Sequence, residues 1–136
     1  MITRYDWLRI FLGLLQLLVG VGAVGGGIAL VYKPDGSALG IPLELLQGSP
    51  FPDYLIPGMV LLVFNGIGSL VAGILTYRRY LYTGELAFIF GGGLMIWIVV
   101  QVMILGYHWM HGLYFSIGLS ELILGLFLRP AMRHSK

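Results

Sequence analysis

The chain has 136 residues, of which 58% are hydrophobic and only 10% are charged, and its formal net charge is +2. A soluble domain carries about 25% charged residues, so the polar side chains here are too few to coat a water-soluble globule. At roughly 20 residues per membrane-spanning helix, the length allows about four spans joined by short connections. The chain contains no cysteine, which excludes disulfides, thiol redox chemistry and a cysteine nucleophile.

Four long apolar runs predict four membrane-spanning helices. The first is interrupted only by Arg9 near its start and by Gln16. It is longer than the apolar core of a signal peptide, about 7–15 residues, and has no small-residue cleavage motif, so we expect it to be retained as a helix. The last is expected to stop at Arg129-Pro130, because proline cannot continue a helix. The predicted spans cover residues 7–32, 55–76, 84–105 and 112–128.

The basic residues are distributed unequally between the two sides that these spans define. Only Lys33 falls on one side, and the other seven fall on the opposite side: Arg4, Arg9, Arg78, Arg79, Arg129, Arg133 and Lys136. Basic residues accumulate on the cytoplasmic side of membrane proteins. The pattern therefore predicts an integral protein of the cytoplasmic (inner) membrane with both termini in the cytoplasm.

The connections between the spans differ in length. The long outer connection, residues 33–54, contains four prolines, so we expect a cap without one regular element. Within it, residues 41–47 are apolar and end before Gly48, which predicts a short interfacial helix. Asp53 is placed to cap the second span. The other outer connection, residues 106–111, is tight, so spans three and four should be antiparallel neighbours.

The chain has 21 glycines, most of them inside the predicted spans. Gly22 and Gly26 are four residues apart, as are Ser69 and Gly73. Helices in lipid associate through such small-residue stripes, because lipid provides no hydrophobic force between them. We therefore interpret the glycines as packing positions. The alternatives are room for a ligand and helix hinges.

Each span carries one strongly polar residue: Gln16, Asn65, Gln101 and Glu121. A charged carboxylate at mid-membrane costs roughly 2.5–3.5 kcal/mol, so Glu121 should face the interior. No basic residue lies at its depth, and we expect it to be protonated or hydrogen-bonded to Gln16 or Asn65. Two hypotheses follow for this polar core. It is either a structural clamp between helices or a site for a proton or ligand.

His108 and His111 form a second candidate site, a weak one for a metal. Two histidines three apart can share a helix face, and Met103, Met110 and the outer carboxylates could add ligands, subsets of which copper or zinc would accept. The alternative, which we favour, is an interfacial turn in which rings occupy the headgroup level. No metal is therefore predicted, and the sequence leaves any cofactor unknown. The sequence also contains no phosphate-binding loop and no nucleophile motif.

The first span opens with Arg9-Ile-Phe-Leu-Gly13-Leu-Leu followed by Gly20, and the second contains Asn65-Gly-Ile-Gly68 and ends at Arg78. These segments resemble those of DoxX-like membrane proteins, in which the position of Asn65 usually carries a glutamate. The resemblance implies a small four-helix bacterial protein with a long first outer connection. It also implies a possible relation to subunits of quinone-linked oxidoreductase systems.

These patterns predict an all-α fold, a four-transmembrane-helix bundle with an outer cap, as a single domain over residues 1–136. The expected function is non-catalytic: an accessory or self-associating subunit whose partners are the lipid bilayer, further copies of itself or a larger membrane complex, and not nucleic acid. The alternative is a carrier or receptor for an apolar ligand, a lipid or quinone, within the bundle. An enzyme that uses Glu121 as proton donor or acceptor is the third possibility.

Overall fold

The computed structural model describes residues 4–134, which form four long helices and, within that range, no strand. The first is α1 (Arg4–Tyr32). The second is built from three consecutive segments, α2 (Leu55–Val60), η3 (Leu61–Gly68) and α3 (Ser69–Tyr77). The last two are α4 (Thr83–Leu105) and α5 (Trp109–His134). All four are long and apolar enough to cross a membrane.

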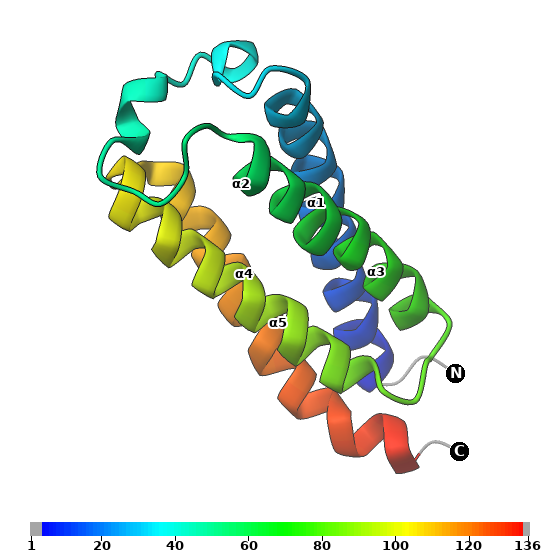
Figure 1. Cartoon of the computed structure of the whole chain (residues 1–136). Coiled ribbons are helices and arrows are strands. Elements are labelled where there is room, and N and C mark those ends of the chain that lie inside the picture. The colour runs from blue at the N-terminus through cyan, green and yellow to red at the C-terminus, as the bar shows by residue number, and fades with distance from the viewer. Residues whose placement is uncertain (1–3, 135–136) are drawn as a thin grey trace.

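Both ends of the described chain lie at one end of the bundle, together with the short connection between α3 and α4 (Figure 1). We call this the terminal end. Residues 33–54 and the tight turn between α4 and α5 lie at the opposite end, which we call the capped end. The helices α4 and α5 pack as an antiparallel pair, as the tight turn predicted, and α1 packs along all three segments of the second helix.

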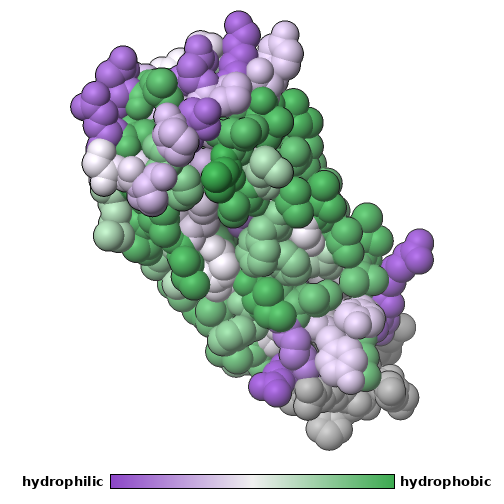
Figure 2. All heavy atoms as spheres, viewed as in Figure 1, coloured by the Kyte–Doolittle hydropathy of each residue, from purple (hydrophilic) through white to green (hydrophobic). Residues whose placement is uncertain are grey.

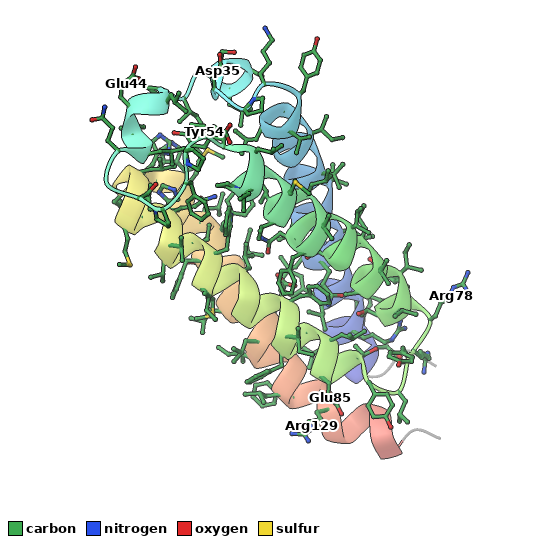
Figure 3. The ribbon with its side chains drawn as sticks, in the orientation of Figure 1. Asp35, Glu44, Tyr54, Arg78, Glu85 and Arg129 are labelled. Carbon is green, nitrogen blue, oxygen red and sulfur yellow. The ribbon has the colours of Figure 1, made fainter. Side chains whose placement is uncertain are left out.

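The surface of the bundle is apolar along its middle and polar at its two ends (Figure 2). Large apolar side chains point outward over this middle region, including Val21, Ile96 and Met103. Charged residues lie near the terminal end, where Arg79 Nη2 is 2.6 Å from Asp6 Oδ1 and Arg129 faces Glu85 (Figure 3). In lipid, the hydrogen bonds within a helix satisfy its backbone N–H and C=O groups but not its outward-pointing side chains. Those side chains must therefore be apolar, which is what this belt provides.

The fourth helix does not end where the sequence predicted. It continues through residue 130 to His134, whereas Pro130 was expected to stop it at Arg129. Proline removes one backbone donor, but its fixed φ near −65° is a helical value. The chain keeps its helical course past this residue to His134.

The second helix contains a π-helical stretch, η3, that the sequence did not predict. Its wider turn carries Asn65 and Gly66 on the buried side. π-Helical turns are rare and mark positions where packing or function outweighs regular hydrogen bonding. At the start of this helix, Asp53 Oδ1 accepts a hydrogen bond from the backbone N–H of Leu55 at 3.0 Å, but the N-cap position itself belongs to Tyr54, whose side chain makes no cap hydrogen bond.

The cap over the bundle contains two 3₁₀ turns, η1 (Ser37–Leu39) and η2 (Leu43–Leu46). The single short helix predicted over residues 41–47 is therefore reduced to one turn. Leu46 of η2 packs in a buried cluster with Leu30 and Tyr54. The Tyr54 hydroxyl donates a hydrogen bond to the carbonyl of Pro42 at 2.8 Å. These contacts fasten the cap to the ends of α1 and α2, where Figure 3 shows Tyr54 beneath it.

Candidate functional site

The polar core lies between two apolar clusters. One contains Leu12, Ala87, Leu124 and Leu128, and the other contains Val19, Leu94 and Ile98 with Ile117 beside them. On α1, Gln16 lies between Leu12 and Val19. On α5, Glu121 lies between Ile117 and Leu124. Because the flanking residues pack together on both sides, Gln16 and Glu121 share one level of the bundle.

Gln16 is fully buried and has one hydrogen-bonding partner on the second helix. The Thr76 hydroxyl donates to Gln16 Oε1 at 2.7 Å, and it also lies 2.8 Å from the carbonyl of Ala72. A hydroxyl has one proton, so these two bonds are alternatives. Gln16 Nε2 has no hydrogen-bond partner among the described residues. The Gln16 amide thus links α1 to α3 through its oxygen alone.

Glu121 is also fully buried, and it packs against the backbone of α4. A β-carbon added at Gly91 would lie 2.9 Å from Glu121 Cβ, so the two helices are in close contact here. Neither carboxyl oxygen has a hydrogen-bond partner in the part of the chain that the structure describes. The predicted hydrogen bond from Glu121 to Gln16 or Asn65 is not present. A buried carboxyl without a partner costs stability.

Asn65 is buried on η3, and neither end of its amide has a hydrogen-bond partner among the described residues. Its neighbour Gly66 fits against Val24 of α1. Val24 is eight residues beyond Gln16, about 12 Å along the helix at 1.5 Å per residue. The structure therefore buries all three predicted core residues, but Gly66, the neighbour of Asn65, meets α1 at Val24 and not at the level of Gln16.

Gln101 lies elsewhere, in a cavity of about 720 Å³ at the capped end. Its walls come from the cap, the end of α1, the start of α2, and the adjacent ends of α4 and α5. Most are apolar, including Leu30, Leu45, Leu46, Phe51, Leu61, Ile104 and Leu105; the polar groups are Tyr54, Trp97, Gln101, Tyr107, His108, His111 and Tyr114. A cavity of this size, mostly apolar with a few polar groups, is typical of a small-molecule site.

His108 and His111 form a helix cap at the start of α5. The backbone N–H of Met110 donates to His108 Nδ1 at 3.3 Å, and the backbone N–H of His108 donates to His111 Nδ1 at 2.9 Å. This is the reciprocal pattern of a capping box, in which the N-cap and N3 side chains each satisfy a free backbone donor. Within the described residues, no group of three histidine, aspartate or glutamate side chains is arranged to hold a metal ion.

The glycine stripes pack inside the bundle. Gly20 and Gly27 of α1 lie against Leu70 and Leu62 of the second helix. Gly91 lies against the carbonyl of Gly118, so that α4 and α5 meet backbone to backbone. Added β-carbons at these positions would approach their neighbours within 3 Å. The predicted packing role of the small residues is confirmed for these contacts, and they lie within one chain.

The cavity residues Trp97, Tyr54 and Tyr114 were not predicted as site residues. They come from separate segments and have no motif in common. The one available signal was the apolar character of residues 39–46, which is unusual for a water-exposed connection and fits a segment that covers an apolar space.

No family model matches the chain, and no curated protein or solved structure matches it. The relation to DoxX-like proteins stays a prediction.

Proposed function

We propose that the protein binds an apolar small molecule, a lipid or a quinone, in the cavity at the capped end. The observation that carries the proposal is the 720 Å³ space with mostly apolar walls beneath a cap that is anchored by Tyr54 and Leu46. Ligand sites in proteins have volumes of about 300–1,000 Å³ and a few fixed polar groups. Gln101, His111 and Tyr114 are such groups here.

The position of the cavity across the membrane supports a ligand that comes from the lipid. Aromatic side chains at the capped end, Tyr32, Tyr107 and Trp109, are more than half exposed. Such rings favour the boundary between lipid headgroups and hydrocarbon. In the proposed orientation, with both termini in the cytoplasm of an inner membrane, the cavity lies at the outer boundary, where lipids and quinones present their polar groups.

An accessory or self-associating subunit has less support. That prediction rested on small-residue stripes available to a partner helix. Gly20, Gly27 and Gly91 are instead occupied by neighbouring helices of the same chain. The cavity at the capped end, by contrast, is not filled by packing within the chain, and a ligand-binding function would use it.

The test is to fill the cavity. Ile104→Trp places a large side chain on its wall, and Ile96→Trp is the matched control, because Ile96 lies on the same helix with its side chain 68% exposed on the surface. The proteins are purified in mild detergent, and the molecules that remain bound are identified by native mass spectrometry and by extraction. We expect a bound lipid or quinone in the wild type and in Ile96→Trp, and its loss in Ile104→Trp. Equal occupancy in all three proteins, or none in the wild type, would contradict the proposal.

A further inference from the structure

His108 and His111, at the start of α5, have defined hydrogen-bonding states. Each Nδ1 accepts a backbone N–H, at 2.9 Å for His111 and 3.3 Å for His108. A nitrogen that accepts a hydrogen bond carries no proton, so each neutral ring has its proton on Nε2. The capping box therefore makes both imidazoles hydrogen-bond donors through Nε2, and neither ring has a free acceptor.

His111 is the better placed of the two donors to meet a ligand. Both histidines line the cavity, but His108 is exposed whereas His111 is half-buried. Its ring lies near the ring of Tyr107, with centroids 6.3 Å apart, and its Nδ1 is held by the backbone of residue 108. Both contacts restrain the ring of His111, which thus holds a fixed position on the wall of the cavity.

Resting on the proposed function, we propose that the ligand of this cavity carries a carbonyl-type oxygen that accepts a hydrogen bond from Nε2–H of His111. The rest of the ligand is apolar and lies against Leu46, Leu61 and Ile104. An ester carbonyl of a membrane lipid and a ring carbonyl of a quinone share this chemistry. A pure hydrocarbon lacks it, and so does a ligand whose only polar group is a cation.

The test compares two probes that differ only in the carbonyl. One is a long-chain ketone with a bromine atom on the chain, and the other is the same brominated chain without the oxygen. Bromine quenches tryptophan fluorescence on contact. Trp97 lines the cavity, and replacing Trp7 and Trp109 by phenylalanine leaves it as the only tryptophan of the chain. All binding is measured with this single-tryptophan protein, freed of lipid in detergent.

His111→Gln and His111→Met separate the donor from the size of the side chain. Gln keeps an N–H donor and an oxygen able to serve the cap, whereas Met has a similar length and no donor. We expect the ketone to bind about three- to tenfold more tightly than the brominated alkane, the range for one hydrogen bond between neutral groups. The Gln variant should keep this preference, and the Met variant should lose it while its affinity for the alkane is unchanged.

Each result bears on the proposal. Equal affinity of the two probes for the parent protein would overturn the carbonyl acceptor while leaving the apolar site intact. Quenching by neither probe would overturn the proposed function as well. If the Met variant no longer binds the alkane because it has unfolded, His111→Glu replaces it, since Glu serves the capping box and has no donor when ionised. Displacement of the ketone by a diacyl lipid or by an isoprenoid quinone identifies the source, and displacement by neither contradicts the acceptor assignment.

Discussion

The hydroxyl of Thr76 and the amide of Gln16 meet at 2.7 Å in the buried contact between α3 and α1. The same two helices are joined again nearer the terminal end, where Arg9 Nη1 donates to the carbonyls of Thr76 and Tyr77 at 3.2 Å each. The carbonyl of Thr76 also accepts the backbone N–H of Arg79 at 3.2 Å, so Arg9 adds a second donor to it at the end of α3. Thr76 is therefore held to α1 through both its side chain and its backbone.

Thr76→Val should destabilise the protein, because it leaves the Gln16 amide without any partner. We expect the free energy of unfolding in detergent to fall by about 0.6–2 kcal/mol, the range for hydrogen bonds between membrane helices. Thr76→Ser keeps the hydroxyl and is the control. A Val variant as stable as the Ser variant would show that the hydrogen bond to Gln16 does not contribute to stability.

Gly91→Ala should destabilise the contact between α4 and α5. The added methyl group would lie 2.7 Å from the carbonyl of Gly118 and 2.9 Å from Glu121 Cβ, so the helices must separate. Overpacking of this kind costs about 1–3 kcal/mol. The neighbouring Gly92→Ala is the control, since its nearest atom would be 3.8 Å away. Thermal unfolding of both variants measures the difference, and equal melting temperatures would contradict the close helix contact.

The four long helices could be predicted from the sequence because apolar length alone determines them, and three of the four end within one residue of the predicted boundary at their C-terminal side. The fourth was predicted too short, because Pro130 was taken as the end of the helix, whereas α5 continues to His134. Hydropathy also carries no signal for the π-helical turn at Asn65.

The candidate site was harder to predict, because it depends on distances between segments. Glu121 and Gln16 are buried at one level, and the burial of Glu121 was expected, but no hydrogen bond joins the two side chains. The two histidines were considered as metal ligands, and the sequence gives no sign that their Nδ1 atoms serve the backbone of α5. The cavity at the capped end could not be predicted, because it forms only when the tertiary fold places the cap over the ends of α4 and α5.

The hydrogen bond of Tyr54 to the cap should persist at high pH. Burial raises the pKa of the Tyr54 phenol above its ordinary value of 10.0, and the negative charge of Glu44 adds to the effect. Because the pKa in the folded protein is the higher one, this contribution to stability is complete below pH 10 and is lost as the pH rises through the folded pKa. The difference in tyrosinate absorbance between wild type and Tyr54→Phe should therefore show a titration with its midpoint above 10.0. A midpoint at or below that value would contradict the burial of this phenol.

The proposed orientation predicts that the two ends of the bundle face different compartments. Ser37 and Arg78 are exposed at the capped end and the terminal end, and the chain has no cysteine of its own. In intact bacterial cells, a membrane-impermeant thiol reagent should label Ser37→Cys from outside and label Arg78→Cys only after the cells are opened. The opposite pattern would reverse the orientation, and labelling of both variants from outside would contradict a membrane-spanning bundle.

Glu121 provides the sharpest test of the polar core. If its carboxyl is a clamp that holds Gln16 or Asn65, Glu121→Leu leaves an amide unmatched and should cost about 0.6–2 kcal/mol. The structure gives the carboxyl no hydrogen-bond partner among the described residues, and replacing an unpartnered buried polar group by an apolar one is neutral or stabilising. We therefore expect Glu121→Leu to be at least as stable as the wild type.

Glu121→Gln is the companion variant, because it keeps the shape of the side chain and removes only the titratable proton. Its melting temperature in detergent should equal that of the wild type. If both variants fold normally and the Gln variant loses the bound ligand of the capped end or its biological activity, the carboxyl has a role in function and is kept at the expense of stability. If Glu121→Leu were less stable than the wild type by more than about 1 kcal/mol, the size of a typical hydrogen bond between membrane helices, the result would instead support the clamp hypothesis.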